Sequence, residues 1–363
     1  MTPRPRAEVL RLPAYGGGRA GDEPTHRLGS NESPFPPSAA VRAAIAASAG
    51  AAHRYPPLRP AELETRLAGH LGVRPEQVLA GGGSIAVLEQ LVRAFAGPGD
   101  RVAYAWRSYE AYPILVAAAG ATPLEVPLRD SAPDLSAVAA ALTPDVRVIL
   151  VCNPNNPTST VLPPGALPAF VAAVPEDVLI VVDEAYREFV PAGGTDDGVR
   201  LQRAYPNVAV LRTFSKAYAL AGLRAGYCVA DPAVLDAARR VALPFTLSAP
   251  ALAAALATLD EPEPTARRVR RLTGSRDRLV AELRAAGLEV PASGTNFVWL
   301  PFGDVSREFL RQCTLAGIGV RVFPGEGVRI TVGDEDANAA VVAAARRCSH
   351  PLRTADCGPR HGT

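Results

Sequence analysis

The chain has 363 residues, of which 48% are hydrophobic and 20% charged, and its formal net charge is +2. This length and apolar content allow a large globular domain with a smaller one attached. The near-neutral charge, without a basic cluster between aromatic residues, argues against nucleic acid or an anionic membrane as partner, so we expect a small-molecule ligand. The N-terminus lacks the apolar core of a signal peptide, no run could span a bilayer, and the five cysteines have no metal-ligand spacing. We therefore expect a cytoplasmic protein with reduced thiols and no metal.

Short apolar segments alternate with helical patterns between about residues 75 and 245. The expected strands are 101–106, 122–127, 146–152, 178–183, 208–213 and 225–230. The expected helices are 84–95, 110–119, 134–141 and 163–174, each flanked by Gly or Pro. This alternation predicts βαβ units and a doubly wound α/β domain with a mainly parallel sheet.

The pattern changes after Pro244, where a smaller α+β domain is expected. It comprises a long arginine-rich helix at 263–286, strands at 296–300, 320–323 and 328–332, and a closing helix at 334–348. We assign 1–40 to an N-terminal segment that packs with the small domain, 41–245 to the large domain, 246–350 to the small domain and 351–363 to a disordered tail.

Lys216 is the only lysine in the sequence, although lysine and arginine together number 38. A guanidinium keeps its proton at working pH, whereas a lysine amine can be desolvated, deprotonated and made nucleophilic. Lys216 is therefore a candidate for amine chemistry. By count alone, a surface lysine that persisted by chance is an equally good interpretation.

Polar residues follow three of the expected strands. They are Asn153, Asn155 and Asn156 after 146–152, Asp183, Glu184 and Tyr186 after 178–183, and Thr213, Ser215, Lys216 and Arg224 after 208–213. In open α/β sheets, ligands bind beyond the carboxyl ends of the strands, so these residues are expected to converge on one site. Asp183 would be partly buried and would need a cation such as a protonated pyridine nitrogen, the alternatives being a helix cap or a structural ion pair.

The glycine-rich turn at 80–84 opens into a helix, where backbone N–H groups and the helix dipole suit a phosphate. Gly81, Gly83 and Ala86 match a dinucleotide fingerprint only loosely, so a nicotinamide cofactor is not favoured. A plain helix-start turn remains the alternative for this segment by itself.

Several ordered motifs together resemble the fold-type I pyridoxal-phosphate (PLP) aminotransferases, in particular the histidinol-phosphate aminotransferase branch. They are RYP at 54–56, NPNNPT at 153–158, DEAYREF at 183–189 and RTFSKAYALAGLRAGY at 212–227. GSNESPFPPS at 29–38, TNFVWL at 295–300 and VRITVG at 328–333 extend the resemblance to nearly the whole chain. Within the branch, GGGSIAVLEQLV and WRSYEAYPILVAAAGATPLEVPL look most like actinobacterial aromatic amino acid aminotransferases.

The resemblance implies pyridoxal 5′-phosphate as cofactor and a homodimer with shared active sites. It assigns Lys216 to the Schiff base and to proton transfer, Asp183 to the pyridinium nitrogen, and Tyr186 to the ring 3′ oxygen together with Asn156. Tyr109 would stack on the ring. The residues implied around the phosphate are Ser84, Ile85, Thr213, Ser215, Arg224 and, reaching over from the other subunit, Tyr55. Arg329 would clamp the substrate carboxylate, while Arg321, Asn31 and Tyr15 would line the rest of the substrate site.

The reaction expected from the resemblance is transfer of an amino group from phenylalanine or tyrosine to a 2-oxo acid such as 2-oxoglutarate. Histidinol-phosphate transamination, an aminotransferase of specialised metabolism, decarboxylation, and a regulatory protein without turnover remain alternatives. In a histidinol-phosphate enzyme, Arg321 would bind the substrate phosphate with Tyr15 and Tyr55. Three departures from the family pattern leave the exact substrate open: Ser159 in place of Gly, Ile85 in place of an acidic residue, and Thr246 in place of Asn.

Overall fold

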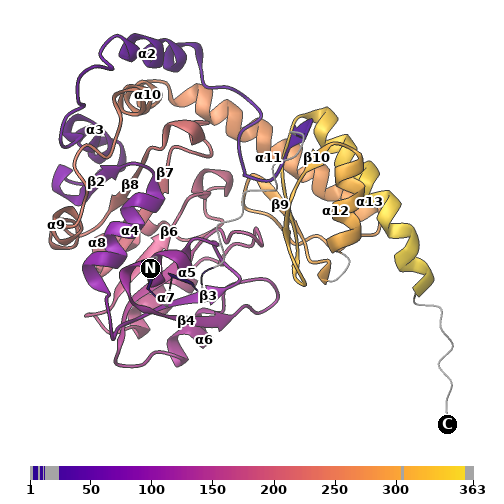
Figure 1. Ribbon diagram of the computed structural model, residues 1–363, viewed down its shortest axis with the longest axis horizontal. Helices are drawn as coiled ribbons and strands as arrows, with labels where there is room; N and C mark the ends of the chain where they lie inside the picture. The colour runs from indigo at the N-terminus through magenta and orange to yellow at the C-terminus, as the bar shows by residue number, and fades with distance from the viewer. Residues whose placement is uncertain (1–2, 7–8, 11, 13–23, 304–305, 356–363) are drawn as a thin grey trace.

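The computed structural model describes residues 3–6, 9–10, 12, 24–303 and 306–355. Two domains lie side by side, joined by the long helix α11 (Pro262–Ala285) (Figure 1). The large domain contains a seven-stranded sheet, and the small domain carries a three-stranded sheet against α12 (Ser306–Leu315) and α13 (Glu335–Ala355). No helix in the described ranges is both long enough and apolar enough to cross a lipid bilayer.

The large sheet is mainly parallel, with the strand order β2-β8-β7-β6-β5-β3-β4. Its strands are β2 (Val78–Gly81), β3 (Arg101–Trp106), β4 (Thr122–Pro127), β5 (Val146–Cys152), β6 (Leu179–Asp183), β7 (Val208–Thr213) and β8 (Gly226–Val229). The pairs from β4 to β7 are parallel, and β8 runs antiparallel to both of its neighbours. The predicted α/β fold with a mainly parallel sheet is thereby confirmed.

Both faces of this sheet are buried, because successive strand residues point to opposite sides. In β5, Ile149 and Val151 enter one core while Val148 and Leu150 enter the other. One face is covered by α4 (Ser84–Phe95), α5 (Tyr112–Ala119) and α9 (Pro232–Arg240). The opposite face is covered by α2 (Ala39–Ala49), α3 (Ala61–Leu71), α6 (Leu135–Ala140), α7 (Ala166–Ala173), α8 (Gly198–Ala204) and α10 (Ala249–Asp260). The strands are therefore held in place from both sides, and their carboxyl ends form a fixed edge.

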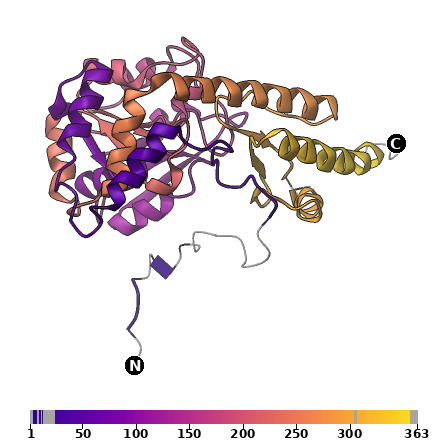
Figure 2. The ribbon, with the colours of Figure 1, turned by 90° about the horizontal axis from the view of Figure 1, so that it is seen from above.

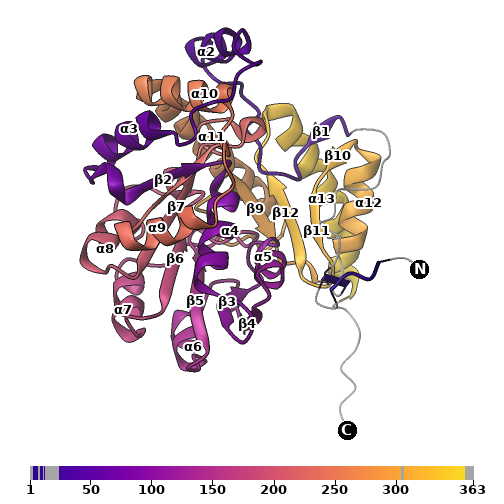
Figure 3. The same ribbon diagram turned by 60° about the vertical axis from the view of Figure 1, so that its left-hand side comes forward.

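The small domain packs its own core beside that edge. Its strands are β9 (Phe297–Leu300), β11 (Arg321–Phe323) and β12 (Gly327–Thr331), all antiparallel, with β1 (His26–Arg27) paired to β10 (Ile318–Gly319). In Figure 3 the large sheet lies on the left and β9, β12 and β11 on the right. Within the described residues, short 3₁₀ helices lie at Pro75–Gln77, Arg187–Phe189 and Ala221–Leu223.

The predicted domain limits differ from the packing at three places. Helix α10 lies beyond residue 245, but it packs on α2 and belongs to the core of the large domain. The small domain therefore begins within α11, which extends along α13 (Figure 2). Leu28 lies in the small-domain core, whereas Arg6 donates a hydrogen bond to the carbonyl of Ala118 at the end of α5 in the large domain. Helix α13 continues through Ala355, into the predicted tail, and 356–363 lie outside the described residues.

Candidate functional site

A cavity of about 370 Å³ opens at the carboxyl edge of the large sheet, between the two domains. Cys152, Asp183 and Thr213 line it from the ends of β5, β6 and β7. The start of α4, the N-terminal segment 29–32 and the β11–β12 hairpin complete its wall. The predicted convergence of three strand ends therefore occurs, at the position where ligands bind in open α/β sheets.

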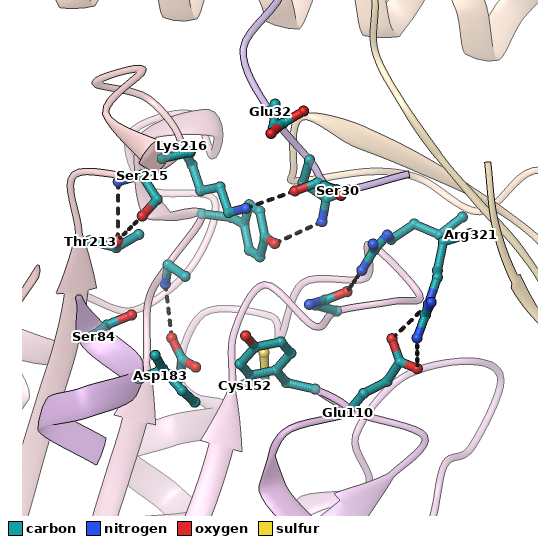
Figure 4. Close-up of a pocket in the computed structure, with 18 of the residues that line it drawn as sticks. Ser30, Glu32, Ser84, Glu110, Cys152, Asp183, Thr213, Ser215, Lys216 and Arg321 are labelled. Atoms are coloured by element: carbon teal, nitrogen blue, oxygen red, sulfur yellow. Dashed lines mark hydrogen bonds and ion pairs between the residues drawn. The ribbon is translucent and has the colours of Figure 1, made fainter. Parts of the chain in front are cut away.

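Lys216 projects into this cavity from the turn that follows β7 (Figure 4). Its Nζ donates a hydrogen bond to the carbonyl oxygen of Ser30 at 3.1 Å. Removal of the amine from water, reinforced by the positive charges of Arg329 and Arg224, lowers its pKa to about 7. A substantial fraction of the amine is thus neutral and nucleophilic near neutral pH.

Asp183 is buried at the end of β6. Its Oδ2 accepts a hydrogen bond from the hydroxyl of Tyr112 at 3.0 Å, and its Oδ1 accepts one from the backbone N–H of Ala185 at 3.2 Å. Burial outweighs both bonds and raises its pKa to about 6. Within the described ranges no arginine or lysine forms an ion pair with this carboxylate, so the site favours a cationic ligand atom beside it.

Tyr186, which follows β6, and Arg329, on β12 of the small domain, line the side of the cavity where the two domains meet. The ring of Tyr186 packs edge-on against Phe297 of β9, with centroids 5.1 Å apart, and its hydroxyl accepts a hydrogen bond from Asn31 Nδ2 at 2.8 Å. Burial raises the pKa of this phenol, which therefore stays protonated. Arg329 Nη1 donates to Asn156 Oδ1 at 2.6 Å, so this amide oxygen orients the guanidinium in the cavity.

The turn before α4 and the loop after β7 form a cup suited to an anion. Arg224 lies against the turn, with its Nη2 2.9 Å from where a Cβ at Gly83 would stand, and the φ of 93° at Gly83 is a backbone conformation that favours glycine. Arg224 Nη1 donates to Ser215 Oγ at 3.3 Å, and the hydroxyl of Thr213 donates to the same oxygen at 3.0 Å. Arg224 itself has φ 56°, a strained conformation of the kind that clusters at binding sites. The first turn of α4 carries no acidic residue, so its dipole and N–H groups remain available to a phosphate.

The far end of the cavity contains an ion pair that the sequence did not indicate. Arg321, at the start of β11, binds Glu110 through two bonds, Nη2 to Oε1 at 2.7 Å and Nε to Oε2 at 3.1 Å. Figure 4 places this pair opposite Ser84 and Thr213. Arg321 therefore faces the cavity, as predicted, but with its charge balanced by a carboxylate.

The remaining predicted site residues have different positions. Tyr109 and Ile85 line the cavity. Tyr55 does not line it: its side chain is 81% exposed and its ring stacks on Phe245 with centroids 4.5 Å apart. Tyr15 lies outside the described residues.

Sequence reasoning assigned no role to Ser30, Tyr112 and Glu110, although all three lie within motifs that carry the resemblance, because their partners Lys216, Asp183 and Arg321 are distant in the chain. Conversely, two of the polar residues that were expected at the site, Asn155 and Glu184, do not line the cavity and serve the fold instead. Asn155 bonds Ser108 and Thr158, and Glu184 pairs with Arg212 at 2.7 Å, away from the cavity. Distance along the sequence therefore does not separate site residues from structural ones.

Ser159 keeps the left-handed backbone conformation that a glycine usually supplies at this turn, with φ 63°. It is buried, its backbone N–H donates to the carbonyl of Asn155, and its carbonyl accepts from Gly294 N–H. The turn is thus formed despite the substitution, at the cost of backbone strain. The side chain of Asn156, beside this turn, still reaches the cavity.

Comparisons with known proteins agree with this geometry. The family model described as aminotransferase class I and II matches residues 24–345. The chain is 48% identical to an aromatic amino acid aminotransferase of Thermobifida fusca, over 96% of this chain and 97% of that protein. It is 46% identical to an aromatic amino acid aminotransferase of Streptomyces avermitilis, over 93% and 95%. Its fold is similar to the histidinol-phosphate aminotransferase of Sinorhizobium meliloti, solved with pyridoxal-5′-phosphate, with TM-score 0.89 and 30% identity over 97% and 99% of the chains.

Proposed function

Since the chain belongs to the class I and II aminotransferases, we propose that it moves the amino group of an aromatic L-amino acid, phenylalanine or tyrosine, to a 2-oxo acid such as 2-oxoglutarate. The observation that carries the reaction type is the cavity that contains Lys216, Asp183 and Arg329 together. The aromatic substrate follows from the relatives at 46–48% identity, which bear that name. The histidinol-phosphate relative is more distant, at 30% identity.

The enzyme uses pyridoxal phosphate, and three features of the cavity fit this cofactor. The buried carboxylate of Asp183 suits a protonated ring nitrogen, the cup formed by Ser84, Ser215 and Arg224 suits the phosphate, and the Lys216 amine suits the aldehyde carbon. When bound, the cofactor supplies an electron-withdrawing ring that makes the Cα–H bond of the amino acid acidic.

In the proposed mechanism, Asp183, Lys216 and Arg329 act on the cofactor and the substrate, and Tyr112 and Asn156 position them. Asp183 would keep the ring nitrogen of the bound cofactor protonated, and Tyr112 holds the Asp183 carboxylate in place through the hydroxyl bond at 3.0 Å. Lys216 would move the proton between the substrate Cα and the cofactor C4′, because an amine whose pKa is lowered to about 7 can both take up and release a proton near neutral pH. Arg329, oriented by Asn156, binds the α-carboxylate through the guanidinium fork.

The substrate assignment predicts a clear ranking of amino donors. The purified holoenzyme is mixed with phenylalanine, tyrosine or histidinol phosphate, and loss of the visible absorbance of the bound cofactor is followed in single turnovers. We expect kcat/KM for phenylalanine or tyrosine to exceed that for histidinol phosphate by at least about a hundredfold, roughly 2.7 kcal/mol of transition-state preference. A lead for histidinol phosphate would refute the aromatic assignment and leave the aminotransferase assignment intact.

We also propose that the enzyme is a cytoplasmic homodimer in which Tyr55 reaches the phosphate of the partner subunit's cofactor. An exposed apolar patch supports this arrangement: the side chains of Tyr55, Leu58 and Leu243 are 81%, 67% and 73% exposed, and the ring of Phe245 stacks on Tyr55. The next residue, Thr246, packs against Gly82 at the edge of the phosphate cup. The patch therefore adjoins the cup without entering the cavity, and a second copy would bury it.

Subunit mixing tests this shared site. Lys216→Ala and Tyr55→Ala homodimers are each expected to be impaired, and their heterodimer is expected to regain up to half of the activity of the unmodified dimer. The reason is that one of its two sites combines an intact Lys216 with an intact Tyr55 from the other chain. The matched control, Lys216→Ala mixed with a Tyr55→Ala, Lys216→Ala double variant, stays inactive. A verified heterodimer without rescue would place Tyr55 in its own subunit's site or outside the site.

A further inference from the structure

In the part of the chain that the structure describes, two ion pairs cross the junction between the domains, and only one of them lines the cavity. Arg107, which follows β3, pairs with Glu326 in the β11–β12 turn, Nε to Oε2 at 2.9 Å. Glu110, three residues later, pairs with Arg321 on the same hairpin. The cavity wall includes Glu110 and Arg321 but not Arg107 or Glu326. The two pairs thus have similar structural settings and different access to a ligand.

The Glu110–Arg321 pair occupies the end of the cavity where a substrate side chain would lie. The proposed carboxylate site at Arg329 lies on β12, and Arg321 is its direct partner in the neighbouring strand β11. The cup around Ser84 is at the opposite end (Figure 4). A substrate held by Arg329 would therefore extend its side chain towards the Glu110–Arg321 pair and away from the phosphate cup.

The geometry of the pair determines what this end can bind. Both Glu110 oxygens accept from the Arg321 fork, the arrangement that a carboxylate or phosphate of a substrate would otherwise adopt. The two side chains are 24% and 26% exposed, so the pair is partly desolvated and still accessible from the cavity. An anionic side chain would have to displace Glu110 from Arg321 or remain beside its negative charge. An aromatic side chain has no charge and can pack against the pair without breaking it.

We propose that Glu110 is a specificity-determining residue that occupies Arg321 and thereby favours uncharged side chains over those that end in a carboxylate or a phosphate. This inference deepens the proposed function and rests on it. It also predicts a cost for the second half-reaction, since the distal carboxylate of 2-oxoglutarate must compete with Glu110 for the same guanidinium.

Binding of two inert ligands to the holoenzyme tests Glu110 without relying on turnover. Glutarate carries two carboxylates, one for Arg329 and one for Arg321, whereas 3-phenylpropanoate carries one carboxylate and a phenyl ring. Dissociation constants are measured by isothermal titration calorimetry for the unmodified enzyme, Glu110→Gln and the matched control Glu326→Gln. Gln keeps the shape of Glu110 and removes its charge, and Glu326→Gln removes a carboxylate from the other pair, outside the cavity wall.

In Glu110→Gln we expect the affinity for glutarate, relative to that for 3-phenylpropanoate, to rise at least tenfold, or about 1.4 kcal/mol. The gain should be absent from Glu326→Gln and lost in the Glu110→Gln, Arg321→Gln double variant, which shows that it depends on Arg321. A smaller rise, or an equal change in Glu326→Gln, overturns the proposal. If glutarate binding improves as expected but phenylalanine is not a substrate, then the aromatic assignment fails while the role of Glu110 stands.

Discussion

Lys216→Ala is expected to lower turnover by roughly 10⁴-fold or more, because the amine that carries the cofactor and moves the substrate proton is lost. The visible absorbance of the lysine-bound cofactor should disappear in the same variant. Borohydride reduction of the unmodified holoenzyme, followed by peptide mapping, should find the cofactor attached at Lys216. Since the chain has no second lysine, no other side-chain amine can take its place.

A matched control separates amine chemistry from charge. Lys216→Arg retains a positive charge in the cavity, but its guanidinium cannot deprotonate, so turnover should fall as far as in Lys216→Ala. The native amine, by contrast, has a pKa lowered to about 7. Turnover within tenfold of the unmodified enzyme in either variant, or reduced protein without a label at Lys216, would contradict the assignment.

Asp183→Asn is expected to lower the rate by several orders of magnitude while the cofactor remains bound through Lys216 and the phosphate cup. An amide cannot hold the ring nitrogen protonated, so the ring withdraws electrons less effectively. Single-turnover rates with a saturating amino donor measure the loss. A rate within about tenfold, a difference of only roughly 1.4 kcal/mol, would show that Asp183 does not have this role.

Asp183→Asn, which should lower the rate of the holoenzyme, should instead raise the stability of the apoenzyme. Because burial raises the Asp183 pKa from 3.8 to about 6, the folded apoenzyme binds this proton more tightly than the unfolded chain does. Its free energy of unfolding therefore falls as the pH rises through that interval, and at pH 7 the charged carboxylate costs about 2–3 kcal/mol. Asp183→Asn should remove this pH dependence and raise the apoenzyme's stability at pH 7, as measured by urea unfolding. An apoenzyme destabilised by the substitution at pH 7 would show that the carboxylate contributes net stabilisation to the fold.

The regular elements of the large domain follow from local sequence. Expected and observed limits coincide for β3, β4, β5, β7 and α4, because each is an apolar run of the right period bounded by Gly, Pro or polar residues. The four-residue strand β2 escaped detection because it has no alternation and merges with the glycine-rich turn. Helix α10 was placed in the wrong domain, because its apolar face does not reveal which of two cores it will join.

The candidate site likewise contains residues that could be identified from the sequence and contacts that only the tertiary structure shows. Lys216, Asp183, Asn156 and Arg224 could be identified from the sequence, because they follow buried strands whose carboxyl ends must meet at one edge of the sheet. Three features could not: the bond from Tyr112 to Asp183, the contact of Lys216 with Ser30, and the pairing of Glu110 with Arg321. These partners lie 71, 186 and 211 residues apart in the chain, and no local pattern links them. The sequence by itself thus determined the chemistry available at the strand ends. Only the packing of the small domain against that edge decided which charges are balanced, because electrostatic partners are chosen by distance in space and not along the chain.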